Sequence, residues 1–537
     1  MAELKMQRRM MIGLALLLSM FLASIVRIGL IDRENYAETA EQQNSVTLSL
    51  SPLRGNLFDC NGKKLTGNNY ETKTVFAPTP QAIRYAQSVL TGEEADRALS
   101  LFKSGKPYVS QQSFAGECDG VYTVQIPCYE NGKSQAQHLC GYTDRDLKGI
   151  SGLQKAYDDQ LKSDQSVRIR FAGSGSGRAL AGIRAVVEEG EDVTESGIVT
   201  TLDSSVQSIV ESVGTQIEQG AIVVSRVKNG ELAACASFPG FDPEKAGEYL
   251  ERSDSPFLNR ALCSYNVGSA FKLCVAAAAL NHNQGDFVNI CSGKVSLDGH
   301  DFYCHKRSGH GQLDLAGAIR NSCNTYFYQF SQIVGARSIY ETATGVGFGY
   351  ERTVCPGLKT SGESLPTLAS LEENPKALAN LAIGQGTLLA SPVTLSKLYE
   401  AIANQGVYYP TRVVCGAMKR GSPQPDEEKP TPTRLMSQET AEQLRKMLIG
   451  VVEEGTGKAA RPQTVTAGGK TATAQTGRRE ENGKEIEHSW FCGFFPAENP
   501  EYVITVFEEG SRASQSASAV FAQLADGIYR VTRDQKE

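Results

Sequence analysis

The chain has 537 residues, enough for two or three domains, and its formal net charge is −6. This acidic balance, without a basic patch interleaved with aromatic residues, excludes nucleic acid as an expected partner. The thirteen cysteines are odd in number and scattered, without the spacing of a small disulfide-rich domain. Most of them are therefore expected to be small buried hydrophobic residues.

An uncharged run from Met10 to Val26 follows a short basic segment at the N-terminus. As a helix it covers about 25 Å, just enough to cross a bilayer when the Arg27 side chain extends to the interface. No small-residue cleavage site precedes the polar region, so an uncleaved anchor is favoured over a signal peptide. We expect a cytoplasmic tail at residues 1–9, a single transmembrane anchor in the cell membrane at residues 10–31, and all later residues outside the cytoplasm.

Residues 32–200 are expected to form an extended, strand-containing pedestal module. Asn61-Gly62 is a strong hairpin-turn signal between short strands, and Arg54 and Asp59 are placed to pair across that turn. A helix is predicted from about Gln81 to Phe102. No group of residues in this module suggests chemistry, so its expected role is spacing or contact with a partner.

Residues 201–537 have the pattern of a separate α+β domain. Short β-rich runs occur near both ends of this region, and the long middle is largely helical. Such an arrangement predicts an antiparallel sheet sandwiched by helices. The expected strands cover residues 221–225, 232–236, 489–494 and 502–507, and a final helix covers residues 513–531 approximately.

The stretch from Asn266 to Leu280 carries the strongest chemical signal. From Phe271 onward it is apolar on nearly every side, so this helix is expected to be buried. Ser269 and Lys272 lie three residues apart at its start, on one face and one turn apart. Burial should lower the pKa of Lys272 and make it a base, while the N–H group of Ser269 points where an oxyanion can sit. The pair therefore predicts a nucleophile, its base and half of an oxyanion hole.

Ser-x-x-Lys alone is a weak signal, because most instances are solvated helix starts. Two further elements follow it: Ser322-Cys323-Asn324 about 50 residues later, and Lys470-Thr471-Ala472-Thr473 about 150 residues beyond that. Taken singly, the first fits a helix cap and the second an exposed strand edge. In order, type and spacing, the set matches the catalytic elements of penicillin-binding proteins and serine β-lactamases.

The chain resembles the class B penicillin-binding proteins, the monofunctional D,D-transpeptidases of peptidoglycan synthesis, over nearly its whole length. The segment from Ser322 to Tyr328 is similar to the elongation-type enzymes. The resemblance implies a penicillin-binding transpeptidase fold in residues 201–537, carried on the pedestal (dimerisation-type) module. Besides the catalytic elements, it rests on Arg54-Gly55, Gly152-Leu153-Gln154, Thr201-Leu202-Asp203, Phe238–Pro243, Asn259-Arg260-Ala261, Ile383-Gly384-Gln385-Gly386 and Trp490–Phe494.

The resemblance also implies the reaction. Unprotonated Lys272 takes the proton from Ser269, which attacks the penultimate D-Ala carbonyl of a peptidoglycan stem peptide. The terminal D-Ala leaves, protonated through Ser322, and an amine of a neighbouring stem then attacks the acyl-enzyme to form the cross-link. β-Lactams are expected to acylate the same serine and to inhibit the enzyme covalently.

The other site residues receive their roles from the same resemblance. Asn324 is expected to orient the base lysine and the substrate amide. Lys470 and Thr471 are expected to bind the substrate carboxylate, and Thr473 to supply the second oxyanion N–H group. Ala472 departs from the family, which usually has glycine there, and its methyl group is expected to crowd the site without removing a catalytic group.

The resemblance implies substrates and partners outside the cytoplasm: peptidoglycan stem peptides or their lipid-linked precursor, β-lactams, and a membrane glycosyltransferase of the shape/elongation/division family. Two other functions stay open. One is a serine β-lactamase or β-lactam sensor, which the large module before Ser269 and the short cytoplasmic tail disfavour. The other is a catalytically weak or silent scaffold of the wall-synthesis complex, which Ala472 suggests.

Residues 300–310 contain three of the six histidines, and Cys291 and Cys304 bracket the start of the same loop. Cysteine and histidine this dense resemble a zinc site, with Cys291, Cys304 and His310 as the preferred ligands. His305 is disfavoured, because neighbours in an extended chain point in opposite directions. A Cys291–Cys304 disulfide, or no bond at all, is the alternative. The resemblance favours zinc, since some relatives from anaerobic Gram-positive bacteria carry it beside the active site; the chemistry itself requires no cofactor.

Gly455-Thr456-Gly457-Lys458 looks like part of a phosphate-binding loop. It lacks the first glycine at the required spacing and the Ser or Thr that should follow the lysine. A nucleotide site is therefore rejected there.

Overall fold

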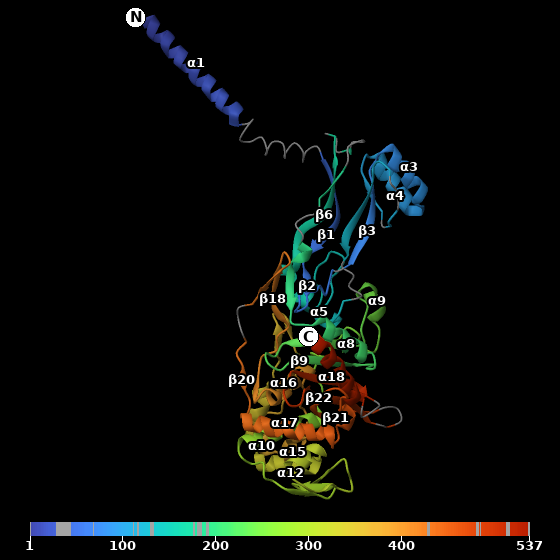
Figure 1. Cartoon of the computed structure of the whole chain (residues 1–537), viewed down its shortest axis with the longest axis vertical. Coiled ribbons are helices and arrows are strands. Elements are labelled where there is room, and N and C mark those ends of the chain that lie inside the picture. The colour runs from blue at the N-terminus through green and yellow to red at the C-terminus, as the bar shows by residue number, and fades with distance from the viewer. Residues whose placement is uncertain are drawn as a thin grey trace. The chain divides into compact units, whose positions relative to one another are not determined.

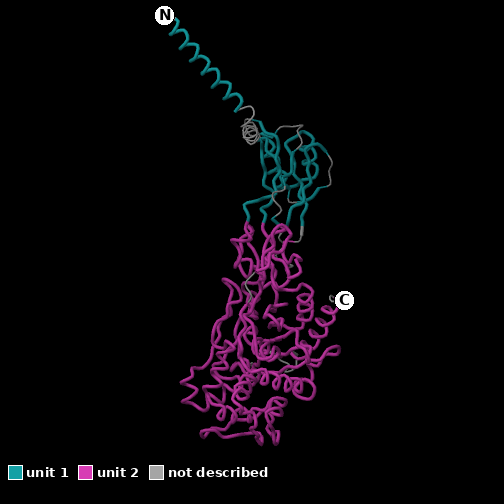
Figure 2. Tube along the Cα trace, turned by 60° about the vertical axis from the view of Figure 1, so that its left-hand side comes forward, with its two compact units in different colours: residues 1–53, 69–128, 163–193 teal, residues 54–68, 129–162, 194–537 magenta. Residues whose placement is uncertain are grey.

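The computed structural model of the chain (Figure 1) describes residues 2–27, 45–67, 69–110, 112–114, 118–128, 134–174, 178–179, 185–188, 193–426, 430–479, 483, 485–511 and 516–534. The chain contains two compact units, which Figure 2 distinguishes by colour. Unit 1 comprises residues 1–53, 69–128 and 163–193, and unit 2 comprises residues 54–68, 129–162 and 194–537. The predicted pedestal segment thus contributes to both units, and its boundaries at residues 32 and 200 stay predictions.

The first helix, α1 (Ala2–Val26), contains the predicted anchor as far as Val26. Its stretch Leu4–Val26 is long and apolar enough to cross a membrane, and its large apolar side chains are exposed. Exposed leucine, isoleucine and phenylalanine along a whole helix are unfavourable in water and are typical of a helix surrounded by lipid. The last part of the predicted anchor, residues 28–31, lies outside the described residues.

Besides α1, the described part of unit 1 contains two three-stranded sheets and the helices α3 and α4. One sheet has the strand order β1-β6-β7, and the other has the order β4-β3-β5. The predicted helix at residues 81–102 is two helices, because Leu90 is extended and Gly92 has a positive φ of 58°. The bounds are β1 Ser45–Arg54, β3 Asn69–Phe76, α3 Pro80–Val89, α4 Gly92–Lys103, β4 Tyr108–Val109, β5 Val121–Cys128, β6 Lys162–Ala172 and β7 Val186–Glu188.

Unit 2 is built on a five-stranded antiparallel sheet with the strand order β10-β9-β23-β22-β21. The first two strands form the predicted hairpin, and β22 and β23 are the strands predicted near the C-terminus. β21, which carries the third catalytic element, is one edge of the sheet. The bounds are β9 Gly220–Arg226, β10 Leu232–Phe238, β21 Gly468–Arg479, β22 Glu485–Phe495 and β23 Tyr502–Ser511.

Helices cover both faces of this sheet, which confirms the predicted α+β sandwich. Side chains alternate along β9, so Ile222 packs in the layer with α8 (Ser204–Gly214) and α18 (Ser516–Asp534). Its neighbour Val223 packs in the opposite layer with α16 (Pro392–Ala403). The sheet therefore has two buried faces, and its strands are apolar at successive positions.

The rest of unit 2 is largely helical and holds the catalytic helix. α10 (Lys272–Asn281) is buried on every side over most of its length, as its apolar sequence predicts. Its neighbours are α11 (Leu315–Arg320), α12 (Asn324–Val334), α13 (Ala336–Val346) and α17 (Gln438–Glu453). The remaining bounds are β2 Asn56–Phe58, α5 Gln137–Cys140, α6 Gly152–Ala156, α7 Asp158–Leu161, β8 Gly197–Thr200, α9 Ala246–Tyr249, β11 Asn289–Cys291, β12 Lys294–Leu297, β13 His300–Tyr303, β14 Gly311–Leu313, β15 Thr353–Cys355, β16 Leu358–Lys359, α14 Leu368–Glu373, α15 Pro375–Ala382, β17 Val407–Tyr408, β18 Val414–Lys419, β19 Ser422–Pro425 and β20 Thr433–Arg434.

The residues around the Asn61-Gly62 turn have partners of longer range than expected. Arg54 is buried, and its guanidinium donates to Asp158 Oδ1 at 2.8 Å and to Gln154 Oε1 at 2.9 Å. Asp59 accepts from backbone N–H groups of its own turn and from the Ser204 hydroxyl at 2.7 Å. The predicted ion pair between Arg54 and Asp59 across the turn is therefore wrong, because each of these side chains has a partner far away in the sequence.

A buried ion pair within α16 predicts a large effect of mutation on stability. Lys397 Nζ lies 2.9 Å from Glu400 Oε2, and both side chains are 0% exposed. Lys397→Met should lower the free energy of unfolding by about 3–5 kcal/mol, because it leaves a buried carboxylate without its cation. The midpoint of thermal unfolding of the full chain measures this loss.

The matched control is Lys446→Met, which removes the exposed Lys446–Glu442 pair of α17 and should cost less than about 1 kcal/mol. The double change Lys397→Met with Glu400→Leu should recover most of the loss. Equal destabilisation by the buried and the exposed lysine changes would contradict the prediction.

Candidate active site

Ser269 and Lys272 lie where the catalytic helix begins. Ser269 belongs to the short 3-10 turn η5 (Gly268–Phe271) and is half-buried, whereas Lys272 opens α10 and is fully buried. One turn of helix separates them, so their side chains project to the same side. The serine hydroxyl therefore lies at the mouth of a site whose amine is inside.

The Lys272 amine is held by the second catalytic element. Its Nζ atom lies 3.2 Å from the Ser322 hydroxyl oxygen, 2.7 Å from the Ser322 carbonyl oxygen and 2.6 Å from Asn324 Oδ1. Burial lowers the pKa of Lys272 to about 7. Near neutral pH, a large share of this amine is therefore unprotonated and able to accept a proton.

Ser322 occupies the turn between α11 and α12 with a positive φ of 51°. A non-glycine residue in this conformation costs about 1–3 kcal/mol and persists only where its surroundings hold it. Here the Ser322 N–H donates to the Ile319 carbonyl at 3.2 Å, and the Ser322 carbonyl accepts from Lys272. The strained turn directs the Ser322 hydroxyl toward the amine.

The third catalytic element lies on the edge strand β21. Thr471 and Thr473 face one side of the strand and are accessible, whereas Ala472 is only 4% exposed and packs in the core opposite Trp490. The methyl group of Ala472 thus points away from the side that carries the threonines. It lies on the same side of the strand as Lys470, and crowding of the site by this methyl group stays a prediction.

Lys470 supplies a second buried amine beside Thr471. Its Nζ atom donates to the Thr471 carbonyl at 3.0 Å and lies 3.4 Å from the Thr471 hydroxyl oxygen. Burial, with Lys272 nearby, lowers the pKa of Lys470 well below its usual range. A bound substrate carboxylate would supply an opposite charge and favour the protonated form, so this end of the site is suited to an anion.

Close backbone approach holds the nucleophile turn against β21. Gly268 has a φ of 56°, and a Cβ atom there would lie 2.5 Å from the Thr473 carbonyl oxygen. Trp490 Nε1 also donates to the Asn266 carbonyl at 3.0 Å. These contacts bring Ser269 beside Thr473, whose N–H group is the predicted second oxyanion donor. Neither the approach of Gly268 to Thr473 nor the hydrogen bond from Trp490 to Asn266 was predicted from the sequence. The feature of the sequence that indicates a close approach here is the glycine directly before Ser269.

The loop rich in cysteine and histidine packs against the second catalytic element. The ligand atoms of Cys291, Cys304, His310 and Cys323 all lie within 4.8 Å of one another. His310 Nδ1 is 3.5 Å from Cys291 Sγ and 3.6 Å from Cys304 Sγ. Tetrahedral zinc, with bonds of about 2.3 Å to sulfur and about 2.1 Å to nitrogen, requires ligand–ligand distances of roughly 3.6 Å. The four residues therefore fit this ion.

Cys323 is the candidate ligand that sequence reasoning misses, although its place inside the Ser-Cys-Asn element is a visible signal. Cys291 and Cys304 are free thiols, not the alternative disulfide. A hydrogen bond from Cys323 lowers the pKa of the Cys304 thiol, and burial lowers the pKa of His310. The same contact raises the pKa of the Cys323 thiol, so the deprotonated, metal-binding form is favoured at Cys304 and His310 but not at Cys323. His305 is exposed, with its ring 5.1 Å from the ring of His310.

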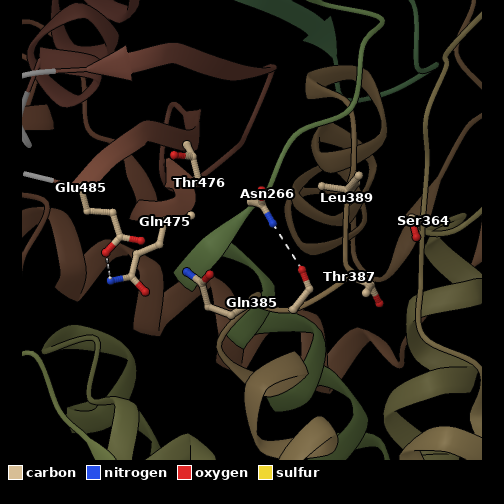
Figure 3. Close-up of a pocket in the computed structure, with 10 residues that line it drawn as sticks. Asn266, Ser364, Gln385, Thr387, Leu389, Gln475, Thr476 and Glu485 are labelled. Atoms are coloured by element: carbon tan, nitrogen blue, oxygen red, sulfur yellow. Dashed lines mark hydrogen bonds between the residues drawn. The ribbon is translucent and has the colours of Figure 1, made fainter. Parts of the chain in front are cut away.

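A cavity of about 640 Å³ is lined on one side by Gln475, Thr476 and Gly477 of the edge strand β21; Figure 3 shows its lining residues. Polar side chains line it, among them Asn266 from the nucleophile segment, Gln385, and Gln475 from β21. Gln475 Nε2 donates to Glu485 on β22 at 2.9 Å. Because Asn266 and Gln475 each lie within three residues of a catalytic residue, the cavity adjoins the catalytic site.

Comparison with known proteins identifies the class that this fold and site define. Residues 220–528 match the penicillin binding protein transpeptidase domain. The chain belongs to the class B penicillin-binding proteins, a family of serine acyl-transferring transpeptidases, which confirms the resemblance. It is 28% identical to stage V sporulation protein D of Bacillus subtilis, covering 98% of this chain and 86% of that protein. It is 27% identical to the peptidoglycan D,D-transpeptidase MrdA of Acinetobacter baumannii, covering 96% of this chain and 86% of that protein.

Solved structures share the fold. The penicillin-binding protein PBP2 of Helicobacter pylori, solved as a complex with MreC, superposes with a TM-score of 0.67 at 21% identity. That likeness covers 91% of this chain and 99% of the solved chain. The D,D-transpeptidase domain of a peptidoglycan glycosyltransferase from Eggerthella lenta gives a TM-score of 0.65 at 23% identity, over 90% of this chain and 99% of the other. The predicted fold is thereby confirmed.

The pKa of Lys272 predicts how acylation of Ser269 by penicillin depends on pH. Only the unprotonated amine can accept the serine proton, and its fraction rises as the pH passes through about 7. The second-order rate constant should fall about tenfold per pH unit below about pH 6 and level off above about pH 8. Rates with a fluorescent penicillin from about pH 5 to about pH 9 measure this; a flat profile would contradict Lys272 as the base.

Proposed function

We propose that the protein cross-links peptidoglycan as a serine D,D-transpeptidase and that β-lactams inhibit it by acylating Ser269. The contact of the buried Lys272 amine with Ser322 and Asn324 carries this proposal, because it gives the nucleophile helix a base and a proton relay. Two relatives add support. The Acinetobacter baumannii protein is named for this activity, and penicillin-binding protein 3 of Mycobacterium tuberculosis has been solved with ampicillin.

The reaction begins with proton transfer from Ser269 to Lys272. The serine oxygen bonds to the penultimate D-Ala carbonyl carbon, and the N–H groups of Ser269 and Thr473 stabilise the oxyanion by about 3 kcal/mol each. The proton then passes through Ser322 to the leaving amine, and the terminal D-Ala departs. An amine of a neighbouring stem attacks the acyl-enzyme, which forms the cross-link and restores the serine.

The donor stem binds as an added strand along the open edge of β21. Its terminal carboxylate lies at Lys470 and Thr471 and its reacting carbonyl at Thr473, so it runs antiparallel to β21. At about 3.3 Å per residue, the third stem residue reaches the cavity beside Gln475 and Glu485. The polar lining of that cavity suits the amide and charged groups of a stem peptide.

The substrate lies outside the cytoplasm, at the cell membrane, and an enzyme anchored in that membrane can reach it. α1 holds the protein in the cell membrane, with its basic N-terminal end in the cytoplasm and the catalytic unit outside. Peptidoglycan stem peptides or their lipid-linked precursor are then within reach. A membrane glycosyltransferase of the shape/elongation/division family supplies the glycan strands, and the Helicobacter pylori relative, solved with MreC, is an example of assembly with a further protein.

We also propose that Cys291, Cys304, His310 and Cys323 hold a structural zinc ion. Their mutual distances suit tetrahedral coordination, and three thiolates with one imidazole are a ligand set that zinc favours. The bound ion supplies no step of the reaction. The four side chains tie the loop rich in cysteine and histidine to the turn of the second catalytic element, and they hold that turn in place.

Labelling with a fluorescent penicillin tests the acyl-transfer function. The native protein should bind about one equivalent covalently, and Ser269→Ala should bind none, because the nucleophile is lost. Ser370→Ala, which changes an exposed serine of α14, is the matched control. A transpeptidase should hold the label for many minutes, whereas a serine β-lactamase should release it within seconds. A folded native protein that binds no label would favour the catalytically silent scaffold.

Metal analysis of the purified full chain tests the zinc proposal. The native protein should contain about one equivalent of zinc, and Cys323→Ser should lower this below about half, because one of four ligands is lost. The midpoint of thermal unfolding should fall in the same variant. Cys415→Ser, at a half-buried cysteine of β18, should change neither quantity. Less than about a tenth of an equivalent in the native protein would contradict the proposal.

A further inference from the structure

The loop Gly455-Thr456-Gly457, which does not fit a phosphate site, contacts Arg320, two residues before the second catalytic element, and Thr471 of the third. It follows α17 and precedes the short turn η6 (Lys458–Ala460). The N–H group of Thr456 donates to the Arg320 carbonyl at 3.2 Å, at the end of α11. The Thr456 hydroxyl oxygen lies 3.0 Å from the Thr471 hydroxyl oxygen. One threonine thus connects the chain before Ser322 with the strand that binds the carboxylate.

The first glycine is needed for this placement, and the second lies where a side chain would be tightly packed. A Cβ atom on Gly455 would lie 2.5 Å from the Arg320 carbonyl oxygen, and one on Gly457 would lie 3.1 Å from Val451 Cγ1. The Gly457 N–H donates to the Val451 carbonyl at 3.0 Å, and the Glu454 carboxylate accepts from the Arg320 guanidinium at 2.9 Å. Backbone and side-chain contacts therefore hold the loop against α11 and α17, and its central threonine has a defined position.

The single proton of the Thr471 hydroxyl determines which of the two hydroxyls, Thr456 or Thr471, donates the hydrogen bond between them. A threonine hydroxyl has one proton to donate and two lone pairs that accept. The Lys470 amine lies 3.4 Å from the Thr471 hydroxyl oxygen. While this amine is protonated it has no lone pair, so it can donate to that oxygen but cannot accept from it. A substrate carboxylate can only accept, so the Thr471 proton must go to that carboxylate. The hydrogen bond between the two threonines is then donated by Thr456.

We propose that Thr456 is a positioning residue for the carboxylate site: its hydroxyl donates to Thr471 and thereby turns the Thr471 proton toward the substrate carboxylate. The inference rests on the proposed transpeptidase function, in which Thr471 binds the carboxylate of the donor stem or of a penicillin. Without the Thr456 hydroxyl, the Thr471 proton is free to rotate away from the cleft. Thr456→Val removes the hydroxyl while keeping nearly the same shape.

The first experiment compares two acylating agents on the full chain in detergent, at about pH 8, where the base is mostly unprotonated. One is benzylpenicillin and the other is its methyl ester, which lacks the anionic carboxylate. Thr456→Val should lower the second-order rate constant for the acid about five- to tenfold and that for the ester less than about twofold. Thr456→Ser, which keeps the hydroxyl, should stay within about twofold of the native protein for both. Thr215→Val, at the exposed end of α8, should change neither rate.

The second experiment is a double-mutant cycle with Thr471→Val. Because Thr456 acts through Thr471, adding Thr456→Val in that background should change the rate with the acid less than about twofold. If the two substitutions instead lower the acylation rate independently, so that their effects multiply in the double variant, the proposal is overturned. Equal losses for acid and ester would also overturn it, since they would show a role in the shape of the cleft only. If neither compound acylates the native protein, the transpeptidase function itself fails, and that outcome is distinct from both.

Discussion

A primary amine kept inside an apolar core is the constraint on which the rest of the structure depends. A lysine in water has a pKa of about 10.4 and is almost always charged at neutral pH. Lys272 is fully buried, and its pKa falls to about 7. The alanine-rich α10 allows neighbouring helices to approach closely enough for that burial. The contacts to Ser322 and Asn324 satisfy the hydrogen-bonding capacity of the amine, so its desolvation is offset without a full counter-charge.

The turn that carries Ser322 is where the separate parts of the catalytic unit meet. Its positive φ is unfavourable by itself, yet three structures restrain it. Lys272 binds its carbonyl, Cys323 joins the cluster of thiols and imidazole on one side, and Arg320 is held by the loop of Thr456 on the other. Ser322, the proposed proton relay, is therefore held in place by residues from three separate segments of the chain.

Local patterns were sufficient for the catalytic helix and the C-terminal strands, because apolar runs and Ser-x-x-Lys spacing are properties of short segments. They were insufficient for Cys323 and Thr456, whose proposed roles depend on partners far away in the sequence. Ala472 is a different case. Because side chains alternate along a strand, Ala472 lies on the face of β21 that does not carry Thr471 and Thr473. The direction of its methyl group into the core could therefore be predicted from the sequence.

In the proposed mode of donor binding, β21 must present an unpaired edge, because the donor peptide pairs with the N–H and carbonyl groups of that edge. An open edge of this kind also invites pairing with another copy of the same strand, which is a route to self-association. The exposed Arg478 and Arg479 at the far end of the strand are charged edge residues of the kind that disfavour such pairing. The strand with which the proposed donor peptide would pair therefore also carries the residues that oppose self-association.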